Sequence, residues 1–169
     1  MPRADYLLAS DDALVAQCEV DRYRASGPGG QHRNKTESAV RLRHKLSGVT
    51  AIGEDSRSQA ENKVHAVRRL RAAIALEVRE PVLGISPRLA AFVASGTAPL
   101  GAKTRQTGEY WTAIAELLDV LVAGGLEIGA TAQRLGMTTG ALSKLLLHDE
   151  LVARTVNDLR RARGMRPLR

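Results

Sequence analysis

A short run of glycine and proline, followed by polar and basic residues, constrains this chain more than any other feature. Residues 26–36 read Ser-Gly-Pro-Gly-Gly-Gln-His-Arg-Asn-Lys-Thr. Three glycines and one proline within four positions exclude a helix or a strand there. Two interpretations remain open at this point. The run is either a plain glycine-rich turn or a loop that presents backbone N–H groups and the Gln31 amide to an oxygen-rich target.

The phosphate-binding P-loop is a rival interpretation of this segment. Its pattern is G-x-x-x-x-G-K-[ST]. Gly29, Lys35 and Thr36 fall in register with that pattern, but Asn34 stands at the position of the second glycine. A P-loop must also lead into a helix, whereas the alternation after Thr36 predicts a strand. We therefore reject the P-loop.

The same loop resembles the GGQ motif of class I peptide chain release factors, which also occurs in related single-domain hydrolases that rescue stalled ribosomes. Gly29, Gly30 and Gln31 form the motif itself. A second stretch, residues 55–63 (Asp-Ser-Arg-Ser-Gln-Ala-Glu-Asn-Lys), is similar to that family's second signature and follows in the right order. The resemblance covers residues 18–76, under half of the chain.

The resemblance implies a peptidyl-tRNA hydrolase that cleaves the ester between nascent peptide and tRNA in the peptidyl transferase centre. It implies that the backbone N–H of Gln31 stabilises the negative charge that develops on the ester oxygen. Gly29 and Gly30 would permit the loop conformation, and the Gln31 amide would orient water. His32 is assigned a positional role. No cofactor or metal is expected, and a glutamine methyltransferase acting on Gln31 is an implied partner.

Charge favours a nucleic-acid partner. The net charge is +7 and the isoelectric point is about 10.2, and a basic surface attracts polyanions. Aromatic residues are scarce, which argues against base stacking and favours phosphate contacts by arginine and lysine. With the ribosome as partner, we expect contacts to rRNA or tRNA. The expected rRNA- or tRNA-binding residues are Arg24, His32, Arg33, Asn34, Lys35, Arg57, Lys63, Arg68, Arg69, Arg160, Arg161 and Arg163.

Period-two alternation predicts a small antiparallel sheet in the first half. Residues 18–23 and 39–46 alternate apolar with polar side chains, and a Ser-Gly turn joins the second stretch to residues 49–52. The glycine loop is then an excursion between two strands. A short helix over residues 10–17, capped by Ser10, precedes the sheet.

A capping box predicts the start of a longer helix. Ser58 would cap the first turn while the Glu61 carboxylate reaches back. An apolar stripe at helical spacing is expected to pack on the sheet, and a basic set to lie mostly off it. The stripe is Ala60, Val64, Val67, Leu70 and Ile74, and the basic set is Lys63, Arg68, Arg69 and Arg71.

The second half reads as helical, with a helix-turn-helix-like pair over residues 130–146. Gly136 makes the turn and Thr138 caps the second helix. That helix offers only Ser143 and Lys144 as polar side chains among apolar ones, a poor set for reading bases in DNA. A structural bundle or a module that contacts the RNA backbone is preferred, and small-subunit RNA is its candidate partner. An amphipathic helix over residues 149–163 and an arginine-rich end follow.

These patterns predict an α+β fold. A GGQ catalytic domain, a small antiparallel sheet with a packed helix, is expected over residues 1–80, a linker with a short helix over 81–108, and an all-α module with a basic end over 109–169. A chain of 169 residues has no room for the codon-reading and switch domains of full release factors. We therefore expect codon-independent ribosome rescue. One departure from the family is Arg33, which stands where most members carry a small apolar residue.

Two alternatives stay open: a release factor specialised for damaged ribosomes, and a non-enzymatic nucleic-acid-binding regulator that uses the helix-turn-helix. The rest of the composition is typical of an ordinary soluble protein. No apolar run reaches the ~18 residues of a membrane span, no secretory signal is visible, and Cys18 is the sole cysteine. We expect a cytoplasmic monomer with no membrane partner.

Overall fold

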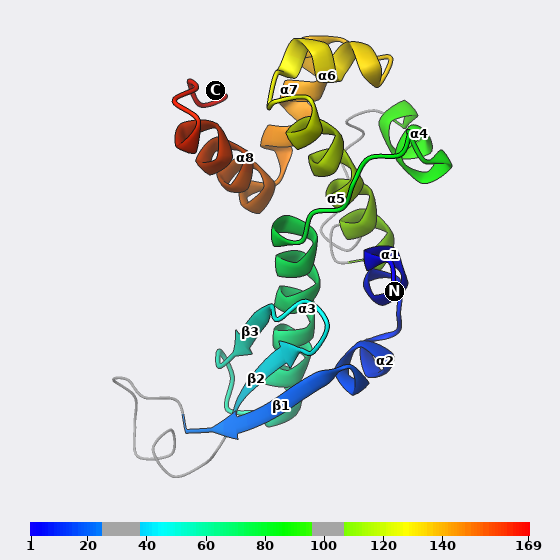
Figure 1. Cartoon of the computed structure of the whole chain (residues 1–169). Coiled ribbons are helices and arrows are strands. Elements are labelled where there is room, and N and C mark those ends of the chain that lie inside the picture. The colour runs from blue at the N-terminus through cyan, green and yellow to red at the C-terminus, as the bar shows by residue number, and fades with distance from the viewer. Residues whose placement is uncertain (25–37, 96–106) are drawn as a thin grey trace. The chain divides into compact units, whose positions relative to one another are not determined.

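The computed structural model describes residues 1–24, 38–95 and 107–169, and the chain divides into two compact units, residues 1–78 and 79–169 (Figure 1). The expected boundaries at residues 80 and 108 stay predictions. Strands and helices are combined as an α+β fold, which confirms the expected class. In chain order the elements are α1 (Arg3–Leu7), α2 (Asp11–Ala16), β1 (Cys18–Tyr23), β2 (Ala39–His44), β3 (Thr50–Gly53), α3 (Gln59–Glu77), α4 (Pro87–Ala94), α5 (Gly108–Ala123), α6 (Ile128–Arg134), α7 (Thr139–His148) and α8 (Glu150–Ala162).

The first unit contains a three-stranded antiparallel sheet in the order β1-β2-β3. The predicted strands and the turn between β2 and β3 are confirmed. At that turn the Gly48 N–H donates to the His44 carbonyl at 2.8 Å, and Gly48 has φ +73°, a conformation that favours glycine. The predicted first helix is also present as α2, with Ser10 Oγ accepting from the Ala13 N–H.

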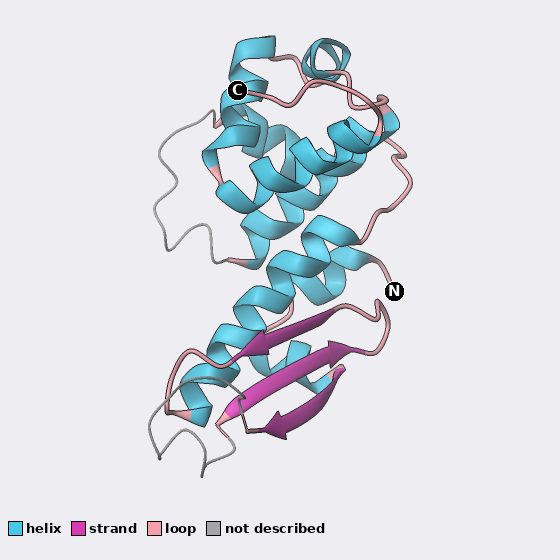
Figure 2. Cartoon of the chain, turned by 90° about the vertical axis from the view of Figure 1, so that its left-hand side faces the viewer, coloured by secondary structure: helices cyan, strands magenta, loops and turns pink. Residues whose placement is uncertain are grey.

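The long helix α3 packs along one face of the sheet, against β2 and β3 (Figure 2). Val67, Leu70 and Ile74 are buried in this contact, as predicted. The prediction was wrong at the start of the helix, where Ala60 is exposed and Val64 is 41% exposed. Asn62 is buried there instead, so a polar anchor sets how the first turns of α3 face the sheet.

Two further expectations in this unit were wrong. Arg71 does not lie on the exposed basic face, because it is 6% exposed and donates to Asp11 Oδ1 at 2.8 Å and to the Ala9 carbonyl at 2.7 Å. It therefore fixes the segment before α2 on α3. Val20 of β1 was expected to be covered, yet it is 45% exposed. β1 is an edge strand, and α3 contacts mainly the other two strands.

The second unit is helical in its described part and packs around α5. Trp111, Ile114, Leu117 and Leu121 of this helix are buried, which agrees with the broad apolar face seen in the sequence. The α6–α7 pair begins two residues before and ends two residues after the expected range of 130–146. Its turn has Gly136 at φ +68°, and the predicted cap is present at the start of α7. A helix-turn-helix role for this pair stays a prediction.

Candidate functional site

The expected catalytic residues lie between the paired strands β1 and β2, in residues 25–37, here called the GGQ segment. Gly29, Gly30 and Gln31 fall outside the described residues, as do four of the expected RNA-binding residues: His32, Arg33, Asn34 and Lys35. The described part supplies the frame on both sides. Tyr23 at the end of β1 pairs with Ala39 at the start of β2. Both ends of the segment are therefore fixed next to each other on the sheet.

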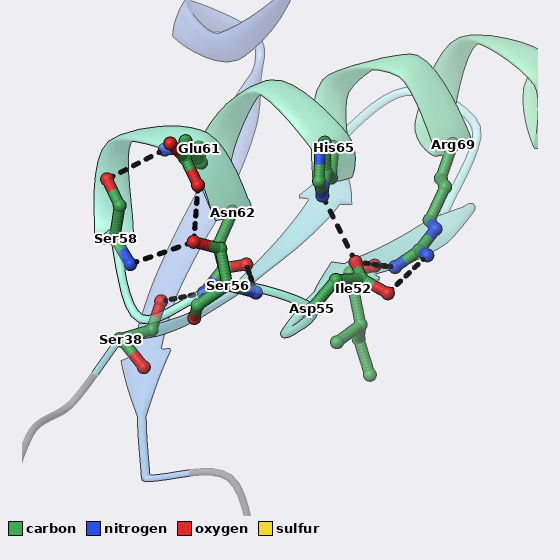
Figure 3. A network of polar contacts seen from close by, with 9 residues as sticks. All are labelled: Ser38, Ile52, Asp55, Ser56, Ser58, Glu61, Asn62, His65 and Arg69. Atoms are coloured by element: carbon green, nitrogen blue, oxygen red, sulfur yellow. Dashed lines mark hydrogen bonds and ion pairs between the residues drawn. The ribbon is translucent and has the colours of Figure 1, made fainter. Parts of the chain in front are cut away.

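Asn62 ties this frame to the start of α3 (Figure 3). Its side chain is fully buried. Oδ1 accepts from the Ser56 N–H at 2.8 Å, and Nδ2 donates to the carbonyls of Ser38 and Ser56, each at 2.8 Å. Ser38 is the first described residue after the GGQ segment. A single amide thus satisfies three backbone groups and fastens the second sequence signature to the exit of the first.

The start of α3 is capped by a relay of hydroxyl groups. Ser58 Oγ accepts from the Glu61 N–H at 3.3 Å, so the serine half of the predicted capping box is confirmed. The glutamate half differs. The Glu61 carboxylate accepts from the Ser56 hydroxyl, and Ser56 Oγ in turn accepts from the Ser58 N–H at 3.1 Å. Ser56 therefore takes the place expected for the glutamate.

Two side chains on the next turns of α3, His65 and Arg69, surround the carboxylate of Asp55 (Figure 3). Arg69 Nη2 donates to Asp55 Oδ1 at 2.8 Å, and Nη1 donates to the Ile52 carbonyl at 2.8 Å and forms an ion pair with Asp55 Oδ2 at 2.8 Å. His65 Nδ1 lies 3.2 Å from Asp55 Oδ2. Hydrogen bonding from Arg69, supported by His65, lowers the pKa of Asp55 to about 2. These contacts connect the end of β3 to α3, so they position the second signature.

Gly53 lets β3 approach α3 closely. A Cβ atom built at this position would lie 2.0 Å from the Asn62 carbonyl oxygen and 2.9 Å from the Ala66 nitrogen. Real side chains cannot occupy such a position without moving the backbone. Neither this glycine nor the Asn62 anchor was among the residues expected at the site. Asn62 lies four residues before Ala66 and eight before Leu70, and this helical spacing is the sequence signal that could have revealed the anchor.

The expected RNA-binding residues of this unit have different environments. Arg57 and Arg68 are exposed. Lys63 is half exposed and lies 3.7 Å from Asp12 Oδ1, and Arg24 is exposed at the entry to the GGQ segment. The guanidinium of Arg69 is engaged by Asp55, as described above. RNA binding by these residues stays a prediction.

A hollow of about 350 Å³ lies between the loop end of β1 and the first turns of α3, on the sheet face against which α3 packs. Val20, Val40 and Ala60 contribute apolar walls, and Arg22 and Lys63 contribute cations. Arg22 was not among the expected binding residues, although its pairing with Val40 places it on this face. The hollow therefore places Arg22 beside Lys63, close to the strand end that leads into the GGQ segment.

Among the described residues, no group of three potential ligands is placed to hold a metal ion. Neither does any helix in the described ranges combine the length and apolarity that crossing a membrane requires.

Comparison with known proteins confirms the resemblance read from the motifs. Residues 14–82 match the RF-1 domain, a range that contains the sheet, α3, the GGQ segment and the second signature. Peptide chain release factor 1 of Albidiferax ferrireducens is 52% identical over 74 residues, which are 40% of this chain and 20% of the relative.

Two further relatives agree. Peptide chain release factor 2 of Acidithiobacillus ferrooxidans is 48% identical over 63 residues, or 37% of this chain and 17% of the relative. The same factor of Haemophilus influenzae is 51% identical over 59 residues, or 35% and 16%. The matches thus span a fifth or less of the length of these relatives, and residues 83–169 lie outside the RF-1 domain match.

Proposed function

We propose, on the premise that residues 14–82 are an RF-1 domain, that this chain hydrolyses peptidyl-tRNA on the ribosome. The observation that carries the proposal is the frame of the GGQ segment. Tyr23 and Ala39 pair at its two ends, and the buried Asn62 amide holds Ser38 at its exit. A catalytic loop gains from a rigid support of this kind, because small misplacements of reacting groups are costly.

The proposed chemistry is ester hydrolysis by water. Water adds to the ester carbonyl carbon, the bond from that carbon to the tRNA oxygen breaks, the peptide leaves as a carboxylic acid and the tRNA regains its hydroxyl. Negative charge develops on the carbonyl oxygen. The Gln31 backbone N–H would donate to it, and one well-placed donor of this kind lowers the barrier by about 3 kcal/mol. Gly29 and Gly30 would permit the approach, and the Gln31 amide would orient water.

The finer features of the proposal concern the ribosome that is recognised. We propose rescue without a stop codon, in the cytoplasm, by a monomer that contacts large-subunit rRNA and peptidyl-tRNA. The RF-1 domain is followed in this chain by a helical unit rich in cations, which gives a means of attachment that needs no codon. Small-subunit RNA is its proposed partner, and a glutamine methyltransferase is the proposed modifier of Gln31.

A second candidate is favoured by the α6–α7 pair. Its turn at Gly136 and its cap at Thr138 are present, and they are the features from which the sequence predicts a helix-turn-helix. A non-enzymatic regulator would need this pair and not the glycines of the loop. A release factor specialised for damaged ribosomes is the third candidate, and it would need both.

Peptide release from purified ribosomes stalled on an mRNA without a stop codon separates these candidates. We expect release by the wild type, and a loss of at least about 100-fold with Gly30→Ala. Gln31→Ala keeps the backbone donor and is expected to retain part of the activity. Full activity of Gly30→Ala would contradict the mechanism. Release only from damaged ribosomes would favour the specialised factor, and no release from either would favour the regulator.

A further inference from the structure

The segment after α8 folds back along the helix. Gly164 has φ +70°, and the Met165 N–H donates to the Arg160 carbonyl at 2.9 Å, which turns the chain. Asn157 then holds Leu168 by both of its backbone groups. Asn157 Oδ1 accepts from the Leu168 N–H at 2.7 Å, and Nδ2 donates to the Leu168 carbonyl at 3.3 Å. The arginine-rich end is therefore an ordered part of the second unit.

Arg160 also holds the folded-back segment, and we call Asn157 and Arg160 together the clamp. Its Nε donates to the Arg166 carbonyl at 2.8 Å, and its Nη1 donates to the Leu126 carbonyl at 2.5 Å. The guanidinium thus joins α8, the folded-back segment and the connection between α5 and α6. We expected Arg160 to contact RNA, but these bonds direct its donors to backbone oxygens of the same unit. The structure gives it a positioning role.

The segment that the clamp orders carries three exposed arginines. Arg163, Arg166 and Arg169 are exposed, and in the described part of the chain no carboxylate lies within ion-pair distance of them. The nearest acid along the chain, Asp158, pairs with Arg161. Residues 128–169 hold eight arginines and lysines against three aspartates and glutamates. An excess of positive charge on an ordered segment raises the local potential, which attracts polyanions.

We propose that Arg163, Arg166 and Arg169 form a phosphate-binding cluster for ribosomal RNA, preorganised by Asn157 and Arg160. Arginine matches phosphate geometry with paired donors. Ordering the segment before binding removes part of the entropic cost of association. The choice of ribosomal RNA as the source of the phosphates rests on the proposed function, and the cluster and its clamp rest on the contacts above.

The test uses the full chain and a short fluorescein-labelled hairpin of ribosomal RNA, titrated at several salt concentrations. Changing the three arginines together to glutamine should weaken binding and lower the slope of log K against log salt by about 2 to 3, since each phosphate contact contributes roughly 0.7 to 0.9. Asn157→Ala keeps every charge. It should leave the slope unchanged and weaken binding by about tenfold, because only preorganisation is lost.

Two variants separate positioning from contact. Arg160→Lys keeps the charge but loses the forked donors, so it should weaken binding as much as Asn157→Ala does. Wild-type affinity with Arg160→Lys, together with loss in Arg160→Gln, would overturn the positioning role. Arg154→Gln is the matched charge control, because Arg154 lies on the same helix and pairs with Glu150 at 3.5 Å. It should bind the hairpin almost as the wild type does.

Three outcomes would overturn the cluster. One is a triple variant that binds as Arg154→Gln does. Another is a triple variant that keeps its RNA affinity while losing affinity for anionic lipid vesicles, since the surface would then serve a membrane. The last is an unchanged salt slope. Binding is measured without peptide release, so a wild type that releases no peptide would refute the proposed hydrolysis and leave this result standing.

Discussion

Two asparagines fix loops in the two units of this protein, and they do so with different strength. Asn62 is fully buried and bonds to three backbone groups, each at 2.8 Å. Asn157 is partly exposed and bonds to the two backbone groups of Leu168 at 2.7 and 3.3 Å. The first amide belongs to the RF-1 domain match and the second lies outside it.

The difference fits the tasks that we propose for the two units. A loop that carries out chemistry needs a position fixed within a fraction of an ångström. A basic segment that holds a polyanion needs only to be kept near the right conformation. Asn62 therefore sits inside the core of its unit, whereas Asn157 works at the surface. This comparison makes predictions about stability as well as function.

The largest effect on stability is expected for Asn62→Ala. Three buried backbone groups would lose their partner, and together this should lower the free energy of unfolding of the first unit by about 4 kcal/mol. Urea denaturation followed by amide NMR signals of residues 39–77 measures the change. Trp111, the sole tryptophan, reports on the second unit, whose transition should not move. A small loss of about 1 kcal/mol would mean that Asn62 is no stronger an anchor than Asn157.

Gly53→Ala should also destabilise the first unit, by about 3 kcal/mol, because the added Cβ would overlap the Asn62 carbonyl. Gly140→Ala is the matched control. No atom lies within 4 Å of a Cβ at that position on α7, so the change should be neutral or stabilise by up to about 1 kcal/mol. Thermal unfolding of both variants measures the contrast. Equal melting temperatures would contradict the close approach of β3 to α3.

Asn157→Ala should cost the second unit only about 1 kcal/mol, because its partners can turn to water. Hydrogen exchange of the Leu168 amide is the direct measurement. We expect faster exchange at Leu168, with α5 and α6 still protected. Unchanged exchange at Leu168 would show that the folded-back segment does not depend on the clamp.

The smallest effect concerns pH. The pKa of Asp55 is about 2 in the folded protein, against an ordinary value of 3.8. A lowered pKa stabilises the fold above the ordinary value, and this stability is lost as the pH falls from about 3.8 to about 2. Because Asp55 is partly exposed, water screening keeps the contribution small. Acid titration of wild type beside Asp55→Asn should show a shallower loss in the variant. Identical curves would contradict a stabilising Asp55–Arg69 pair.

Sequence patterns predicted most elements of the first unit because strands and helices repeat at a fixed period. The strand limits at Cys18, Tyr23 and Ala39 agree with the structure. The misses are polar side chains whose partners lie far along the chain. Arg71 bonds to Asp11, 60 positions away, and Arg160 to Leu126, 34 positions away. Such contacts leave no periodic signal, so charge alone suggested an exposed residue.

For the site, too, the local motifs could be predicted from the sequence and the contacts between distant residues could not. The GGQ motif and the second signature gave the resemblance to class I release factors over residues 18–76, and residues 14–82 match the RF-1 domain. The way in which the two motifs meet was not visible. Asn62 belongs to the second signature, yet its bond to Ser38 depends on how α3 lies on the sheet. A backbone close approach at Gly53 sets that arrangement, and a single glycine in a strand gives only a weak sign of it.

The division of tasks between the two units is tested most directly by peptide release from stalled ribosomes at increasing protein concentration. We predict that Gly30→Ala loses the maximal rate and keeps ribosome affinity. The triple change of Arg163, Arg166 and Arg169 to glutamine should raise the half-saturating concentration and keep the maximal rate. A Gly30→Ala protein with full rate, or an arginine variant that loses only rate, would contradict the account.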